Sequence, residues 1–160
     1  MADVISGRMT HDYDGDLVVF LIGMRINKPW RPDLWFPVFS AMPAMLAELS
    51  KDNDSGLLGY RVTLGAGGPL VVQYWNSHEK LYRFASDRNA AHRPAWAAFN
   101  RLARKAPGAV GIWHETYVVE RAESIYSGMP ASGLASATSV VPVALRGETA
   151  AERLGLRQAA

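Results

Sequence analysis

The sequence predicts an α+β domain in which one antiparallel sheet carries helices on a single face. Residues 17–26 (LVVFLIGMRI) are continuously apolar and rich in β-branched side chains, which indicates a buried central strand. Strand-like runs recur at 57–64, 70–75 and 109–119. Helical patterns separate the first strand from the second and the third from the fourth. The order of elements is therefore β-α-β-β-α-β.

The first helix is predicted from about Asp33 to about Lys51. Apolar residues repeat there every three or four positions, which places them on one helix face. They are Trp35, Val38, Phe39, Met42, Met45, Leu46 and Leu49. Residues 65–69 (GAGGP) have the composition of a turn and join the second and third strands as a hairpin.

The second helix is predicted in two segments. Ser77 is a suitable N-cap for the first segment, with Glu79 in its first turn. The second segment opens at Pro94, since proline suits a first helical position, and it presents Trp96 and Phe99 on one face. The whole order of elements is the split βαβ arrangement of ferredoxin-like folds.

The chain of 160 residues suits one domain. We expect an N-terminal arm at 1–15 and the ferredoxin-like domain at 16–130. Residues 131–160 are rich in Ala, Ser and Gly and are expected to form a tail that packs on the domain or on its dimer partner, with a short strand at 140–143.

The central strand also predicts a homodimer. Residues 18–22 are apolar on both faces of the strand, and the helices cover only one of them. A second copy of the sheet is the simplest cover for the other face. A helix from the tail is the competing cover.

Composition excludes several classes of function. The chain has no cysteine, which excludes disulfides, thiolate catalysis and cysteine-ligated metal centres. The net charge is only +2, so neither nucleic acid nor a membrane is expected as a partner. Residues 1–16 are polar and acidic, unlike a signal peptide, and a cytoplasmic location is expected. Glycine motifs for nucleotides are also absent.

Several motifs together resemble a known family. Residues 19–25 (VFLIGMR) and 73–77 (QYWNS) are followed by 92–100 (HRPAWAAFN), 110–117 (VGIWHETY) and 123–130 (ESIYSGMP). The set resembles the antibiotic-biosynthesis-type monooxygenases with a dimeric α/β barrel. It is most similar to a small bacterial and fungal group that includes an enzyme of the fumagillin pathway. The similarity covers about residues 16–134.

This resemblance implies an oxygenase of secondary metabolism that acts on an electron-rich, hydrophobic small molecule. Some relatives need no cofactor, because the substrate supplies the electrons. Haem-binding relatives provide the alternative of a haem-dependent oxygenase or a dehydratase acting on an N–O bond. A non-enzymatic dimer that binds a hydrophobic metabolite is a third hypothesis, since all three require the same apolar cavity.

His92 is the first candidate catalytic residue, at the start of the helical segment that carries Trp96. Histidine changes its charge near neutral pH and serves as a general base. In the haem alternative, His92 is the iron ligand that the resemblance implies. The competing interpretation is that His92 caps the helix and packs against Trp96.

His114 and Glu115 are adjacent on a predicted strand and therefore point to opposite faces of the sheet. Glu115 lies between two aromatic residues on its face, where a lone charge is unfavourable, and Arg25 is its expected partner. The two form either a structural ion pair or a catalytic pair that holds a substrate anion. His114, on the other face, is a candidate for substrate binding.

The remaining candidates for substrate binding are polar or aromatic residues on the same elements. Gln73 and Trp75 share one face of their strand, and Gln73 is suited to orient a carbonyl or an oxygen-derived group. The others are Tyr60, Trp96, Phe99, Asn100 and Tyr117. For each of them a purely structural role in the core is the alternative. His11 and His78 are expected to face solvent, and no sequence motif for a metal site is present.

Overall fold

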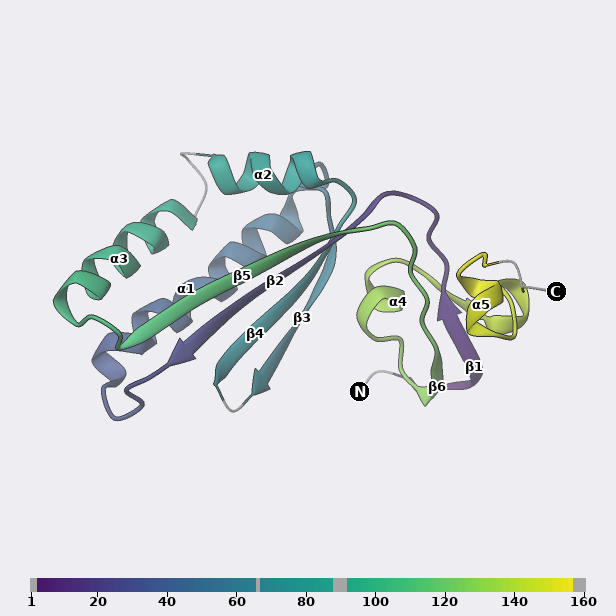
Figure 1. Ribbon diagram of the computed structural model, residues 1–160, viewed down its shortest axis with the longest axis horizontal. Helices are drawn as coiled ribbons and strands as arrows, with labels where there is room; N and C mark the ends of the chain where they lie inside the picture. Colours follow the sequence, from purple (N-terminus) through teal and green to yellow (C-terminus); the bar gives the residue numbers. More distant parts are fainter. Residues whose placement is uncertain (1–2, 66, 88–91, 157–160) are drawn as a thin grey trace.

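The computed structural model describes residues 3–65, 67–87 and 92–156, and for 92–95 the backbone only. A four-stranded antiparallel sheet has the order β3-β4-β2-β5, formed by β2 (Leu17–Ile26), β3 (Leu57–Gly65), β4 (Gly68–Trp75) and β5 (Val110–Val119). Helix α1 (Pro32–Lys51) connects β2 to β3. Helices α2 (His78–Ser86) and α3 (His92–Lys105) connect β4 to β5. The predicted ferredoxin-like fold is confirmed (Figure 1).

The three helices cover one face of this sheet, as Figure 1 shows. Val18 and Trp75 pair across β2 and β4 and pack with Leu49 of α1 and Leu81 of α2. Trp75 is fully buried in this cluster. The Ser77 side chain caps α2 by accepting a hydrogen bond from the Lys80 amide, as predicted. This cluster anchors the ends of α1 and α2 to the sheet.

The opposite face of the sheet is covered at one end only. Helix α4 (Gly133–Ala137) places Leu134 against Leu17, Val72 and Tyr74. The approach is close, since a Cβ built on Gly59 of β3 would lie 2.7 Å from the Cβ of Ala137. The sequence interpretation allowed a tail helix as a cover. The structure places one there over part of the face.

A second, three-stranded sheet lies beside the main domain and has the order β6-β1-β7. It pairs β1 (Ile5–His11) with β6 (Tyr126–Met129) and β7 (Val140–Pro142), all antiparallel. The short strand predicted at 140–143 is thus found. Helix α5 (Ala150–Arg153) follows the 3-10 turn η1 (Val143–Leu145). This sheet joins the arm 1–15 to the tail (Figure 1).

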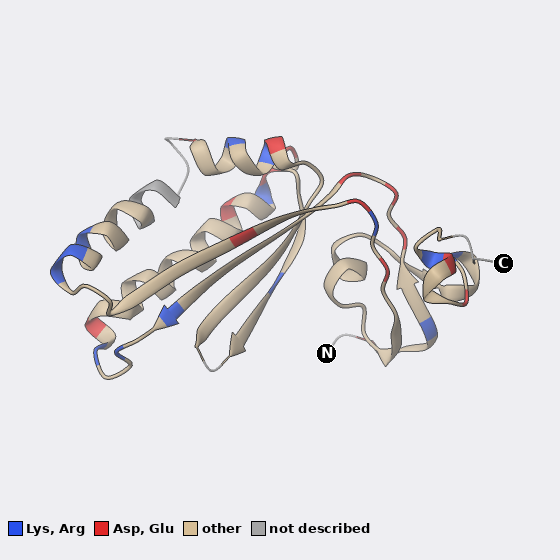
Figure 2. Ribbon diagram, in the orientation of Figure 1, with Lys and Arg blue, Asp and Glu red and all other residues tan. Residues whose placement is uncertain are grey.

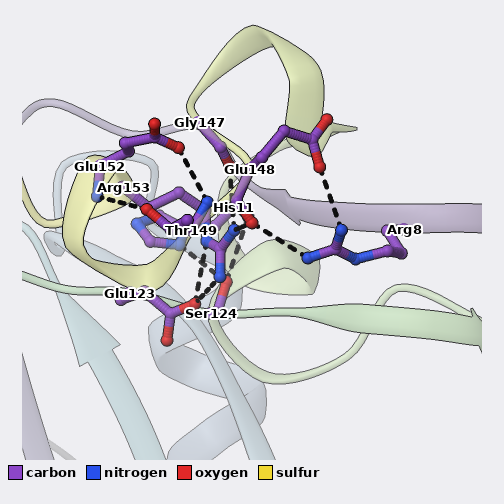
Figure 3. Close-up of polar contacts among 9 residues, drawn as sticks. All are labelled: Arg8, His11, Glu123, Ser124, Gly147, Glu148, Thr149, Glu152 and Arg153. Carbon is purple, nitrogen blue, oxygen red and sulfur yellow. Dashed lines mark hydrogen bonds and ion pairs between the residues drawn. The ribbon is translucent and has the colours of Figure 1, made fainter.

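Polar contacts hold this second unit together (Figure 3). His11 is buried, and its Nδ1 lies 2.8 Å from the Ser124 hydroxyl. The Arg153 side chain, only 5% exposed, donates through Nε to Glu123 at 2.9 Å and through Nη1 to the Gly147 carbonyl at 2.9 Å. The expectation that His11 faces solvent is therefore wrong, because strand pairing covers the arm. His78 is about half exposed, as expected.

Within the ranges that the structure describes, no helix has both the length and the apolar character needed to span a membrane.

Candidate functional site

A cavity of about 320 Å³ lies between the four-stranded sheet and its covering helices. Its floor is formed by alternate residues of the strands, and its walls by α1, α2 and α3. The lining is predominantly apolar, with Phe20, Ile22, Met24 and Val71 from the sheet, Met42, Met45 and Leu46 from α1, and Trp96 and Phe99 from α3. Such a lining suits an apolar small molecule.

Polar groups of the cavity stand on both sides of its apolar floor. In the sheet register, Phe20 of β2 lies opposite Gln73 of β4 and opposite Thr116 of β5. His114 is two residues from Thr116 on the same face, and its ring centroid lies 5.7 Å from that of Phe20. Because neighbouring strands are about 4.8 Å apart, Gln73 and Thr116 are separated by roughly 10 Å across Phe20.

Gln73 is held in place by its neighbour on the strand. Trp75 donates its indole N–H to Gln73 Oε1 at 2.9 Å, and both residues are buried. This bond fixes the orientation of the amide, and its NH₂ is the group that can donate to a molecule in the cavity. Trp75 belongs to the core behind the cavity and acts as the support for Gln73. Their shared face is confirmed by the register.

Helix α3 contributes its aromatic face. Trp96 and Phe99 line the cavity with ring centroids 5.3 Å apart. Trp96 is 44% exposed, which places it at the rim. Asn100 is exposed on the same helix. His92 is the first residue of α3, and its side chain lies outside the described residues, so its catalytic role stays a prediction.

Glu115, Tyr117 and Arg25 lie on the sheet face opposite the cavity. Glu115 pairs with Leu21 and Arg25 with Gly111, which separates them by four residues along β2, about 13 Å at strand spacing. Glu115 accepts a hydrogen bond from the Tyr117 hydroxyl at 2.6 Å. The predicted Arg25–Glu115 ion pair is therefore wrong, because the register offsets the two side chains.

These three residues consequently do not meet His114 at one cavity. The hydrogen bond from Tyr117 to Glu115, together with the negative charge of Glu115, raises the pKa of Tyr117. Tyr60 shares the face of Gln73 but stands at the edge strand β3, 42% exposed, beside a smaller hollow formed with Leu58 and Ala137.

The lining also includes groups that the sequence interpretation did not single out. Phe20 forms part of the floor, Thr116 stands at its margin, and Tyr82 of α2 stands at the rim, 57% exposed. Strand alternation could have identified Phe20 and Thr116 as lining residues. Each lies two positions from another lining residue of its strand, Ile22 and His114 respectively, and therefore on the same face. Tyr82 is next to the buried Leu81, and helical spacing alone does not mark it.

The residues do not fit the haem alternative well. Haem carries two propionate groups that are normally paired with cations, and no Lys or Arg occurs among the described residues of the lining. The implied iron ligand, His92, has no described side chain. Over the part of the chain with described side chains, no three His, Asp or Glu residues are grouped as a metal site would require.

Comparison with known proteins identifies relatives of this chain. A family model described as monooxygenase af470-like matches residues 17–134. The chain is 28% identical over 149 residues to monooxygenase af470 of Aspergillus fumigatus, and the match covers 79% of this chain and 52% of that protein. The chain thus spans about half the length of the curated relative that it matches.

Solved structures with a similar fold were also found. SnoaB, a cofactor-independent oxygenase from Streptomyces nogalater, is 13% identical, with a TM-score of 0.46 over 68% of this chain and 97% of its own. Rv0793 from Mycobacterium tuberculosis is 17% identical, with a TM-score of 0.45, and the match covers 66% of this chain and 98% of that protein. A dimeric ferredoxin-like protein of unknown function from Thermobifida fusca is 17% identical, with a TM-score of 0.44, and the match covers 68% of this chain and 95% of that protein.

Proposed function

The chain belongs to the af470-like monooxygenase family, and from this premise we propose that it transfers one oxygen atom of dioxygen to an apolar, enolisable molecule held in the cavity. The observation that carries the proposal is the composition of the cavity. Its walls are apolar, while Gln73, His114 and Thr116 stand at the margins of the floor. Such an arrangement binds a hydrophobic body and leaves two sides for polar contacts.

We propose that His114 accepts the proton that activates the substrate. Among the described residues that line the cavity, His114 is the only histidine. Imidazole is suited to act as a general base near neutral pH. The anion that forms is stabilised by hydrogen bonds, for which the Gln73 amide is the positioned donor. His92, at the start of α3, remains the other histidine to test.

The substrate itself supplies the electrons in this scheme. A methylene group conjugated through aromatic rings with an enolisable carbonyl loses two hydrogen atoms and gains one oxygen atom, and the second atom of dioxygen leaves as water. Methylene plus dioxygen therefore gives carbonyl plus water, which balances without an external reductant. The protein has to hold the anion, exclude water and admit dioxygen.

Oxygen uptake with anthrone, an apolar enolisable ketone, tests the assignment. We expect the purified protein to accelerate uptake above the rate in buffer, and His114→Ala to lower the rate by about 10²–10⁴-fold, the usual contribution of a general base. His78→Ala is the matched control on an exposed histidine. Full activity in His114→Ala with loss in His92→Ala would move the base to His92. Saturable binding without turnover would favour the non-enzymatic hypothesis.

We further propose that the protein acts as a homodimer. The sheet face opposite the cavity carries Trp113 and Tyr117, 41% and 50% exposed, beside the half-buried Val19 and Leu21. Helix α4 covers one end of that face. A second sheet packed on the remainder removes the exposed aromatic surface from water.

A further inference from the structure

One end of the molecule combines exposed aromatic side chains with positive charge. The loop after β2 meets the turn before β5 there. The backbone N–H of Asn27 donates to the Ala109 carbonyl, and its side-chain NH₂ donates to the Gly108 carbonyl, both at 3.0 Å. We call this surface the basic-aromatic end and define it by Lys28, Trp30, Phe36, Phe39, Arg104 and Lys105.

The aromatic residues follow one another as a strip along the loop before α1 and the first turns of that helix. Trp30 is 72% exposed and Phe36 is 56% exposed. Between them, Trp35 donates its indole N–H to the Pro29 carbonyl at 3.1 Å and contacts the rings of Phe36 and Phe39. Large aromatic side chains exposed together in this way mark an interaction surface.

The strip leads to the cavity. Phe39 is 38% exposed and is also part of the cavity lining. It therefore touches both the outer surface and the space in which the substrate is proposed to bind. An apolar molecule that leaves a hydrophobic environment at this end would reach the cavity along aromatic side chains.

Positive charge surrounds the strip. Figure 2 shows basic segments in the loop before α1 and at the end of α3. Of the described residues at this end, Arg31 is paired with Asp33 at 2.7 Å, whereas Lys28, Arg104 and Lys105 take part in no ion pair with another described residue. From the sequence, no membrane partner is expected, because the net charge of the whole chain is only +2. That sum does not show the excess of positive charge at this end.

We propose that the basic-aromatic end docks on an anionic lipid surface and takes up the substrate from it. Trp and Phe insert at the interface of a bilayer, while Lys and Arg contact acidic head groups. The aromatic strip that ends in an apolar cavity favours lipid over nucleic acid, because it provides a path for an apolar molecule. The uptake step rests on the proposed function, whereas the docking itself is testable without any substrate.

Co-sedimentation with vesicles tests the docking. The full chain is mixed with vesicles of phosphatidylcholine alone or with added phosphatidylglycerol, at about 0.1 M and about 1 M salt, where the screening length falls from about 10 Å to 3 Å. We expect binding to the anionic vesicles only, with loss at high salt. Quenching of tryptophan fluorescence by brominated lipid should accompany binding and should be weaker in Trp30→Ser.

Matched variants separate this surface from the rest of the molecule. Lys105→Glu should lower the partition coefficient at least about fivefold, and Trp30→Ser with Phe36→Ser about tenfold. Two control variants should leave the partition coefficient unchanged. Leu145→Ser removes an apolar side chain that is 72% exposed beside the three-stranded sheet, and Lys51→Glu changes a charge at the far end of α1.

Three results would overturn the proposal. They are equal binding to neutral and anionic vesicles, no binding at low salt, or a change in solution mass of Trp30→Ser with Phe36→Ser, which would make this end an interface between copies. Because the assay contains no substrate and measures no turnover, failure here is distinct from failure of the monooxygenase proposal. Circular dichroism of each variant checks the fold.

Discussion

At the scale of single residues, burial and secondarily the positive charge of Arg146 lower the pKa of His11. The unfolded chain, in which histidine titrates near 6.5, therefore takes up a proton more readily than the folded chain. The stability that neutral His11 contributes is complete above about pH 6.5 and is lost as the pH falls through the lower folded value.

Urea unfolding at a series of pH values measures this effect. We expect the free energy of unfolding to fall between pH 7.5 and pH 5.5, and His11→Gln to flatten the dependence while costing about 0.5–1.5 kcal/mol through the lost contact with Ser124. His78→Gln is the control at an exposed histidine. An equal pH dependence in all three proteins would disprove the role of His11.

Residue positions along a strand were predictable, but contacts between distant segments were not. Strand alternation was enough to place Gln73 with Trp75 and to separate His114 from Glu115. The Arg25–Glu115 pairing failed because register depends on both strands. The burial of His11 depends on Ser124, 113 residues away, to which no local pattern points.

At the scale of elements, the docking of α4 on β3 depends on the absence of a side chain at Gly59. A Cβ there would come within 2.9 Å of the Ala137 backbone. Gly59→Ala should therefore shift α4 and destabilise the fold by about 1–3 kcal/mol. Gly65→Ala, where the nearest atom is 3.9 Å away, should be nearly neutral in the same thermal unfolding measurement. Equal effects would contradict the packing described.

The elements of the main domain were predictable because their apolar periods are regular. The observed β2 and α1 lie within a residue of the predicted ranges, and Ser77 marks the start of α2 through its cap. The three-stranded sheet was not predicted, because β1 and β6 are short and polar and owe their strand structure to pairing with each other. Tertiary context outweighs propensity in such strands.

At the scale of the whole molecule, the proposed dimer predicts a change of mass. Tyr117→Arg places a charge on the uncovered sheet face and should convert the dimer to a monomer in light scattering. Val118→Arg is the control, since it is next along β5, 72% exposed and on the other face. A wild-type monomer, or a dimer that survives Tyr117→Arg, would contradict this arrangement.

The position of the cavity between sheet and helices follows from patterning that the sequence displays. The sequence pattern does not identify the molecule that the cavity binds. The choice of substrate depends on how the side chains of the walls are shaped, among them Met42, Met45, Trp96 and Phe99. The proposed reaction class rests on membership of the af470-like family, and the proposed apolar character of the substrate rests on the lining of the cavity. The proposed docking end adds a source for such a molecule.

The most direct test of the central claim follows labelled dioxygen into the product. Anthrone and ¹⁸O₂ are incubated with the wild-type protein and with His114→Ala, and the anthraquinone is analysed by mass spectrometry. We predict that the wild-type protein accelerates the formation of anthraquinone carrying one ¹⁸O atom, with the other in water, and that His114→Ala does so far more slowly. Formation at the rate in buffer, or label-free product, would contradict the assignment of a monooxygenase to this cavity.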